Sequence, residues 1–242
     1  FSPSRTMRTA QKLYEAGFIT YMRTDSPNLA NEAVGQIVHV VESEFGKEYV
    51  QARVYKAKNK SAQEAHEAVR PTSAHKHSAG TTDDQRELYA LIRARTLASQ
   101  MTDAKVLRTK IRANVEGSVV PDFSANGSRI LFDGWLKADP DARGEDVELP
   151  KVHQGDTLIL VKANTEEKET EPPPRYSEAG LIKELEKRGI GRPSTYASII
   201  STLENRGYVE KQGRTLIPTH TGDVVSTFIE EHFKDYISDT FT

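Results

Sequence analysis

The spacing of apolar residues predicts three helices within the first hundred residues of the chain. The first is expected to end at Gly17, because glycine readily adopts the left-handed conformation of a helix stop. The second is expected to begin at Asp25-Ser26-Pro27, a capping residue followed by proline, and to end at Gly46. The third is expected after Thr82-Asp83-Asp84-Gln85, which has the capping-box form. The apolar positions are Met7, Ala10, Leu13 and Tyr14 in the first helix, Ala30, Ala33, Val34, Ile37, Val38, Val41 and Phe45 in the second, and Leu88, Leu91, Ile92 and Met101, all turned inward, in the third.

The pattern changes between about residues 102 and 171, where short apolar runs are separated by glycines. Short strands with glycine turns are typical of β-structure, so we expect a sheet or a barrel-like fold there. The run Glu171-Pro172-Pro173-Pro174 then predicts an extended linker and a domain boundary. The apolar runs are Val106, Ile111, Val115, Val119-Val120, Ile130-Leu131 and Leu158 to Val161.

The last part of the chain has the order helix, glycine turn, helix, β-hairpin. Ser177 is expected to cap the first of these helices, and Gly189 and Gly207 to end the first and the second. This order is that of a winged helix, a variant of the helix-turn-helix. The sequence therefore predicts a mixed α and β multidomain protein. Its domains are a helical domain at 1–101, a β-rich domain at 102–171 and a helical, winged-helix-like domain at 172–242.

Composition narrows the function classes. Charged residues make up 28% of the chain and hydrophobic residues 36%, and no apolar run approaches the roughly 18 residues of a membrane helix. With no cysteine, thiolate catalysis and cysteine-built zinc sites are excluded. The net charge is only -2, but it is segregated: residues 139–171 sum to -6, while 1–29 sum to +2 and 181–214 to +3. A polyanion is therefore expected to contact the two ends. The start at Phe-Ser-Pro, without Met or a signal-peptide pattern, looks like a piece excised from a longer protein.

Tyr21 lies two positions before Arg23. A tyrosine can be a covalent nucleophile, although a pKa of about 10 makes it weak at neutral pH. A neighbouring arginine would favour the phenolate and clamp the oxygens of a phosphate under attack. On spacing alone the alternative stays open that Tyr21 is a half-buried structural tyrosine and Arg23 a surface charge.

Two further segments carry candidate phosphate ligands. His66 and Arg70 lie one turn apart if their segment is helical, so that one face would present both to a phosphate. The alternative is a surface histidine with no ligand. In the segment from Gly191 to Tyr196, free N–H groups at a helix start would bind an anion, with donors added by Arg192, Ser194 and Thr195. A plain cap and turn is the alternative there. The acidic run Asp139-Pro140-Asp141-Ala142-Arg143 is interpreted as a solvated turn, not a metal site.

Together these motifs form one long pattern. The stretches at 13–26 (LYEAGFITYMRTDS), 62–71 (AQEAHEAVRP) and 187–200 (KRGIGRPSTYASII), with FDGW at 132–135, resemble bacterial DNA topoisomerase I, the type IA family. Order and spacing match along essentially the whole chain. The resemblance implies a part of the toroid of that family, with the first block bearing the tyrosine, the second arching over the DNA hole and the third binding the single strand.

The resemblance also implies roles for single residues. Tyr21 would attack a DNA phosphodiester and keep the 5′ phosphate, and Arg23 would stabilise the transferring phosphate. His66 would take part in DNA binding and in handling protons or phosphate near the break. The expected DNA-binding residues are Arg70, Arg192, Ser194, Thr195 and Arg206.

Partners and cofactors follow from the same resemblance. The family binds single-stranded and underwound duplex DNA and relaxes negative supercoils, and we expect a monomer in the bacterial cytoplasm, at the nucleoid, with no membrane partner. The Mg²⁺ of the family is held by a toprim domain that nothing in this sequence resembles, so no metal ligand is expected in this chain and relaxation by it alone is doubtful. A C-terminal zinc domain is not seen either. Two rival classes remain: a winged-helix binding protein without chemistry, and a tyrosine recombinase, which places its tyrosine after its Arg/His box and forms a 3′ adduct.

Overall fold

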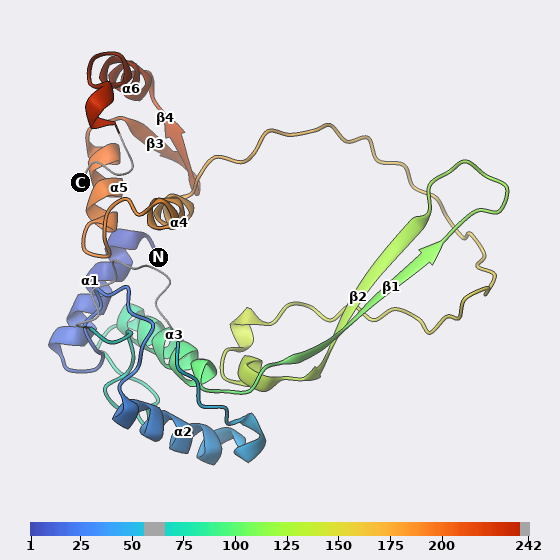
Figure 1. Ribbon diagram of the computed structural model, residues 1–242, viewed down its shortest axis with the longest axis horizontal. Helices are drawn as coiled ribbons and strands as arrows, with labels where there is room; N and C mark the ends of the chain where they lie inside the picture. The colour runs from blue at the N-terminus through green and yellow to red at the C-terminus, as the bar shows by residue number, and fades with distance from the viewer. Residues whose placement is uncertain (56–65, 238–242) are drawn as a thin grey trace. The chain divides into compact units, whose positions relative to one another are not determined.

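The computed structural model describes residues 1–55 and 66–237, which fold as a mixed α and β protein (Figure 1). The chain divides into two compact units. The first unit is built from Phe1–Ala33, Val54–Arg93 and Pro172–Thr242, and the second from Val34–Arg53 and Ala94–Glu171. In the part of the chain that is described, no helix has the length and apolar character that crossing a membrane requires. The division into three domains at 101/102 and 171/172 remains a prediction.

The core of the first unit packs around the N-terminal helix α1 (Pro3–Glu15). Ser2 caps this helix by accepting a hydrogen bond from the Arg5 N–H, and the chain reverses at Gly17, whose φ of +74° favours glycine. The buried residues that pack together are Ala10, Leu13, Ile19, Ala79, Leu88 and Tyr89. The core therefore joins residues that lie up to 79 positions apart in sequence.

Helix α3 (Asp83–Ser99) begins at the predicted cap. Thr82 Oγ1 accepts from the Gln85 N–H, while Gln85 Oε1 accepts from the Thr81 N–H, one residue earlier than in a capping box. The prediction that Leu91 turns inward is wrong, because its side chain is 53% exposed. The buried stripe instead follows Leu88, Ile92 and Thr96, and Met101 is buried beyond the end of the helix.

Helix α2 (Asn31–Phe45) begins about four residues after the predicted start at Ser26-Pro27. The reason is a set of contacts made by the preceding residues with a distant segment. Asn28 O accepts a hydrogen bond from the Ala68 N–H, and the Ala30 N–H donates to a carboxylate oxygen of Glu67. These bonds hold residues 27–30 outside the helix. The predicted end at Gly46 is confirmed, with a φ of +108°.

The last segment of the first unit has the predicted order of elements. Helix α4 (Glu178–Arg188), capped by Ser177 and ended by a left-handed Gly189, is followed by α5 (Tyr196–Asn205). The antiparallel hairpin of β3 (Val209–Gln212) and β4 (Thr215–Pro218) comes next, then α6 (His220–His232), which the sequence pattern did not predict, and the turn η4 (Lys234–Tyr236). Helix α5 contacts α1, and Ser4 Oγ lies 3.1 Å from Ser201 Oγ.

The second unit contains one long antiparallel ribbon, β1 (Lys105–Ala113) and β2 (Phe123–Phe132). Val147 pairs with Ser128 on the other side of β2, and the ring of Phe132 stacks on Tyr49 at 4.9 Å between centroids. The short helices of this unit are η1 (Lys47–Tyr49), η2 (Gly134–Lys137) and η3 (Pro140–Ala142).

The predicted β-structure at 102–171 is confirmed as the two-stranded β1–β2 sheet, whereas the described residues form no barrel there. The apolar run Leu158 to Val161 forms no strand, and its side chains are between 54% and 94% exposed. An apolar run becomes a strand only when a neighbouring strand takes its backbone hydrogen bonds, and no described segment pairs with this one.

Candidate active site

A short antiparallel pairing of two loop segments positions the candidate nucleophile. Ile19 bridges to Pro71, the Thr20 N–H donates to Arg70 O at 2.9 Å, and the Thr72 N–H donates to Phe18 O at 3.0 Å. The Thr20 hydroxyl adds two bonds, donating to Ala68 O at 2.8 Å and accepting from the Arg70 N–H at 2.9 Å. Tyr21 therefore leaves this pairing next to the segment that carries His66.

The prediction of a helix that presents His66 and Arg70 on one face is wrong for residues 66–70, which form bends and extended backbone. Residues 63–65 of that motif lie outside the described residues. Backbone pairing with residues 18–20 replaces the helical hydrogen bonds. The Arg70 guanidinium makes a two-bond pair with the Glu67 carboxylate, at 2.9 and 2.8 Å, and also donates to Pro71 O. Its side chain is only 16% exposed.

Three aromatic rings meet at Tyr21. Its ring packs edge-on against Tyr14 and tilted against His66, with 5.3 Å between centroids in both cases. Tyr14 comes from α1, Tyr21 from the loop after it, and His66 from the distant paired segment. Tyr21 and His66 are partly buried, whereas Tyr14 is 42% exposed. Contacts on two sides hold the Tyr21 ring in place.

These rings line a cleft of about 520 Å³ that also contains two arginines. Within the described residues, neither Arg23 nor Arg192 forms an ion pair with a carboxylate. Asp25 supplies the only carboxylate among the described residues that line the cleft. An unpaired guanidinium is free to form charge-assisted hydrogen bonds with phosphate oxygens. The remaining lining residues are Pro193 and Ser194.

The turn before α5 holds Arg192 in the cleft but presents fewer backbone donors than predicted. Helix α5 begins at Tyr196, and the N–H groups of Thr195 and Tyr196 both donate to Arg192 O. The Arg192 N–H donates to the Thr195 hydroxyl at 2.9 Å. An anion at this turn would therefore contact side chains, above all Arg192 and Ser194. Thr195 is occupied by the turn, and Arg206, exposed at the end of α5, does not line the cleft.

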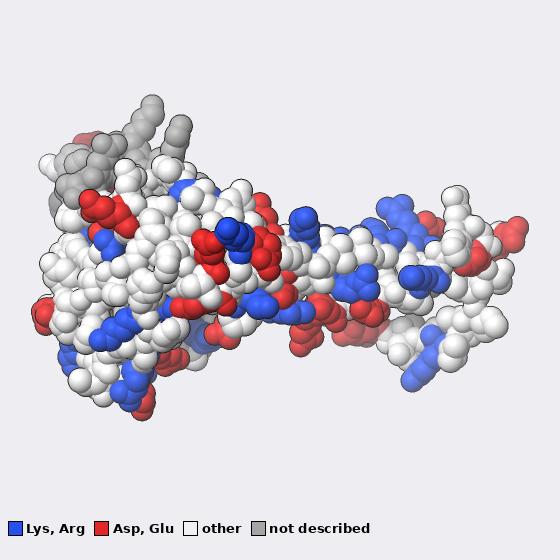
Figure 2. Space-filling model, turned by 90° about the horizontal axis from the view of Figure 1, so that it is seen from below, with Lys and Arg blue, Asp and Glu red and all other residues white. Residues whose placement is uncertain are grey.

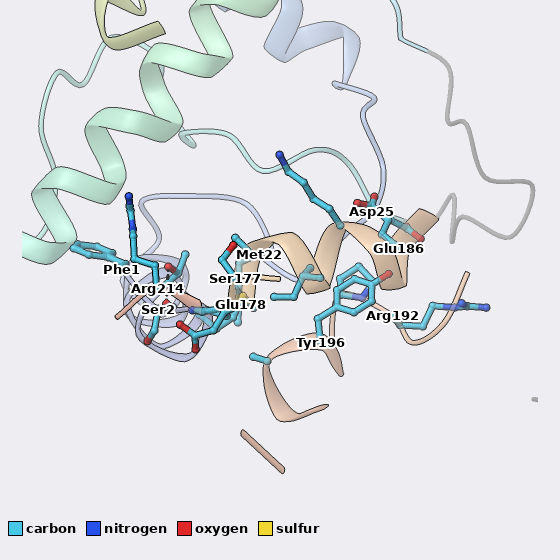
Figure 3. A pocket seen from close by; sticks show the side chains of 18 of the residues that line it. Phe1, Ser2, Met22, Asp25, Ser177, Glu178, Glu186, Arg192, Tyr196 and Arg214 are labelled. Carbon is cyan, nitrogen blue, oxygen red and sulfur yellow. Dashed lines mark hydrogen bonds between the residues drawn. The ribbon is translucent and has the colours of Figure 1, made fainter. Parts of the chain in front are cut away.

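A second, larger cavity of about 860 Å³ adjoins the cleft and shares Asp25, Arg192 and Pro193 with it. Figure 3 shows Asp25, Glu186, Arg192 and Tyr196 at one end of this cavity. Its apolar lining comes from α1, α4, α5 and the loop at Met22. Burial, helped by the carboxylates of Glu186 and Asp25, raises the pKa of Tyr196 above its ordinary value.

The described residues do not by themselves fit a bound Mg²⁺ ion. Among residues 1–55 and 66–237, no group of three histidine, aspartate or glutamate side chains converges. Mg²⁺ requires octahedral oxygen ligands, usually including one or two carboxylates. A single carboxylate, that of Asp25, faces the cleft from the described residues. A metal ion at this cleft would therefore need most of its protein ligands from elsewhere.

The chain belongs to the DNA topoisomerase family, whose model matches residues 1–242. More particularly, its relatives are bacterial DNA topoisomerase 1 proteins, of type IA. It is 44% identical to that of Synechocystis sp. over 98% of the chain and 28% of the relative, and 42% identical to that of Aquifex aeolicus over 100% and 45%. The structure of full-length topoisomerase I from Thermotoga maritima matches with a TM-score of 0.87 and 37% identity, over 100% of this chain and 41% of that one. The chain thus spans less than half the length of these relatives.

The structure brings together Tyr21, Arg23, His66, Arg192 and Ser194, and leaves Arg70, Thr195 and Arg206 outside the cleft. It adds two residues that sequence reasoning did not assign to the site, Tyr14 and Asp25. The apolar spacing places Tyr14 on the buried stripe of the first helix, and Asp25 stands at a predicted helix cap. The position of Asp25 within the TYMRTDS stretch was a signal, whereas nothing in the sequence indicated that Tyr14 turns outward.

Proposed function

We propose that this chain carries the strand-cleaving tyrosine of a type IA DNA topoisomerase, which opens and reseals one strand and relaxes negatively supercoiled DNA. One observation carries the proposal. Tyr21 lies in a cleft beside His66, and the same cleft contains Arg23 and Arg192, neither of which forms an ion pair with a described carboxylate. In the proposed step the phenolic oxygen forms a bond to phosphorus and the bond from phosphorus to the 3′ oxygen breaks. The products are a 5′-phosphotyrosine and a free 3′ hydroxyl, which takes up the proton that Tyr21 gives away. Resealing reverses each of these changes.

The cleft residues have distinct proposed roles. Arg23 and Arg192 neutralise the charge that builds up on the phosphate oxygens during transfer, an effect that is strongest when the donors are already in place. His66 packs on the Tyr21 ring and would bind the DNA and help to move the proton. Ser194 adds a hydroxyl donor to a neighbouring phosphate. Tyr14, half exposed in the cleft, offers a ring face on which a base can stack.

The residues outside the cleft act differently in the proposal. Arg70 is held by Glu67, so we assign it to fixing the His66 segment instead of contacting DNA. Thr195 fixes the turn that carries Arg192. Arg206, exposed at the end of α5, would contact the phosphate backbone beyond the cleft.

Single-stranded DNA is the proposed ligand of the first unit. The large cavity beside the cleft is lined by apolar and aromatic side chains, including Met22, Ile182 and Tyr196, which suits unpaired bases. The order of α4, α5 and the β3–β4 hairpin supports a winged-helix module for this task. In the complete enzyme, a monomer at the bacterial nucleoid, Mg²⁺ would be held by carboxylates of a toprim domain outside this sequence, where it would help to position the scissile phosphate.

The decisive experiment traps the covalent adduct on single-stranded oligonucleotides, using the complete enzyme. Tyr21→Phe should abolish the adduct, because it deletes the attacking oxygen while the ring keeps its packing against Tyr14 and His66. Tyr208→Phe is the matched control, since it removes a tyrosine hydroxyl from the same unit at a residue that lines neither the cleft nor the cavity, and it should keep the adduct. Protein should carry a label placed at the 3′ end of the oligonucleotide and not one at its 5′ end.

Each alternative predicts another result. A label retained from the 5′ end would mean a 3′ adduct and recombinase-like chemistry. Binding without any adduct in the unaltered enzyme would leave a winged-helix binding protein. An adduct that persists in Tyr21→Phe would move the nucleophile elsewhere.

A further inference from the structure

The β1–β2 ribbon of the second unit has two chemically different faces. From Val106 to Ala113 its register is unbroken, so alternate residues of β1 and their partners on β2 share a face. One face carries three cations opposite three small polar residues, in the pairs Arg108–Ser128, Lys110–Asn126 and Arg112–Ser124. We call these six residues the basic face. The other face is mainly apolar, with pairs such as Ile111–Ala125 and Ala113–Phe123.

The three cations of the basic face are exposed, and no described carboxylate forms an ion pair with any of them. The one cation on the opposite face, Arg129, does have a partner, Glu148, at 3.6 Å. Arg108 and Lys110 line a single hollow of about 380 Å³ together with Asn126 and Ser128. Thr109, Gly127 and Val147 complete its lining, so the assignment of the two faces rests on the register alone. In the space-filling view, Lys and Arg side chains lie among Asp and Glu side chains in the part that contains β1 and β2 (Figure 2).

The spacing and chemistry of this face suit a chain of phosphates. Alternate residues of a strand are about 6.8 Å apart, so the three cations form a row of about 14 Å. Arginine and lysine neutralise phosphates, and the hydroxyl and amide groups opposite them add hydrogen bonds of the kind proteins make to phosphate and sugar. We propose that the basic face binds the sugar–phosphate backbone of DNA, at a site that shares no residue with the Tyr21 cleft.

Two alternative roles for these cations lead to different predictions. Lysine and arginine on an edge strand prevent association between copies of a chain, and no described strand pairs with the outer edge of β1. The acidic stretch 139–171 of the same chain is another possible partner. Its Asp146 and Glu148, however, pair with Arg143 and Arg129 and not with the basic face.

The test measures DNA affinity as a function of salt for the variant Arg108→Gln/Lys110→Gln/Arg112→Gln, in the complete enzyme carrying Tyr21→Phe so that no cleavage interferes. Each phosphate contact contributes about 0.7 to the slope of log affinity against log salt on a single strand and about 0.9 on duplex. Losing three contacts should lower the slope by about two units on a single strand, or closer to three on duplex. A difference of two units corresponds to about a 16-fold change in relative affinity over a fourfold change in salt. Running both DNA forms shows which one the face prefers.

Arg129→Gln is the matched control, because it removes one cation from the same ribbon on the opposite face, and its slope should equal that of the parent. A second variant, Arg108→Lys/Arg112→Lys, keeps all three positive charges. Its salt slope should equal that of the parent, since lysine binds phosphate as a point charge. Circular dichroism checks that the ribbon variants stay folded.

An unchanged slope in the triple glutamine variant would overturn the proposal. If the slope is unchanged and the variant self-associates, the role of the cations is to prevent strand pairing at the edge of β1. If the slope is unchanged and only residues 139–171 lose protection from hydrogen exchange, the cations bind that acidic stretch. A separate experiment measures adduct formation at low salt by the triple glutamine variant that retains Tyr21. If this variant still forms the adduct, strand cleavage does not depend on the basic face, and the two proposals can fail independently.

Discussion

The Thr20 hydroxyl is expected to be a main support of the segment that carries Tyr21. It donates to Ala68 O at 2.8 Å and accepts from the Arg70 N–H at 2.9 Å, so it links two segments that lie 48 to 50 residues apart. Thr20→Val keeps the shape of the side chain and removes both hydrogen bonds. The backbone bond from the Thr20 N–H to Arg70 O remains.

The size of the effect follows from those two bonds. A typical hydrogen bond contributes about 1 kcal/mol net, and a partly buried donor left without a partner costs about 1–3 kcal/mol. The Arg70 N–H loses the hydroxyl that accepts its hydrogen bond, and Ala68 O loses the hydroxyl that donates to it, both in partly buried surroundings. We expect the free energy of unfolding to fall by about 2–3 kcal/mol. For a chain of this size that corresponds to a fall in melting temperature of about 4–12 °C.

Urea unfolding of the chain, with amide exchange at Arg70 as a local readout, measures the effect. Thr20→Ser is the control, because it keeps the hydroxyl and should remain within about 1 kcal/mol of the parent. If the valine and serine variants have equal stability and equal protection at Arg70, the hydroxyl does not join the two segments and the reasoning fails.

Three further results are expected. The Arg5 guanidinium lowers the pKa of the Asp84 carboxyl, so the stability that this pair provides is present above the unfolded pKa of about 3.9 and is lost as the pH falls through the lower folded value. Asp84→Asn should flatten that acid limb of the stability curve, and an unaltered acid limb would contradict the reasoning. Arg192→Ala should reduce the salt slope of single-strand binding by less than one unit and weaken binding equally for all sequences, and an effect limited to one sequence would show base recognition instead. The isolated chain should neither relax supercoiled DNA nor bind Mg²⁺ tightly, and relaxation by chain purified free of host enzyme would contradict this.

Local signals in the sequence determined most of the elements. Caps and stops are decided by residues next to each other, so Ser177, Gly46 and Gly189 could be placed before the structure was known. The order helix, turn, helix, hairpin at the end of the chain followed from the same kind of signal. Tyr21 and Arg23 were candidates because a phenol lies two positions from a guanidinium, but spacing alone left a purely structural role open, and the assignment as nucleophile and phosphate-binding residue came from the family resemblance.

The tertiary structure decided which of these residues form a site. Whether residues 66–70 are helical depends on segments about 40 to 50 positions away, because Thr20 and Asn28 take the backbone hydrogen bonds of Ala68 and Arg70. The contacts with residues 67 and 68 also delay the start of α2, and the pairing beside Tyr21 brings the His66 ring to the Tyr21 ring. The apolar run from Leu158 to Val161 forms no strand, because no described segment pairs with its backbone. The spacing of apolar residues shows which secondary structure a segment can form. Contacts with distant segments decide which one it adopts, because buried backbone groups need hydrogen-bond partners.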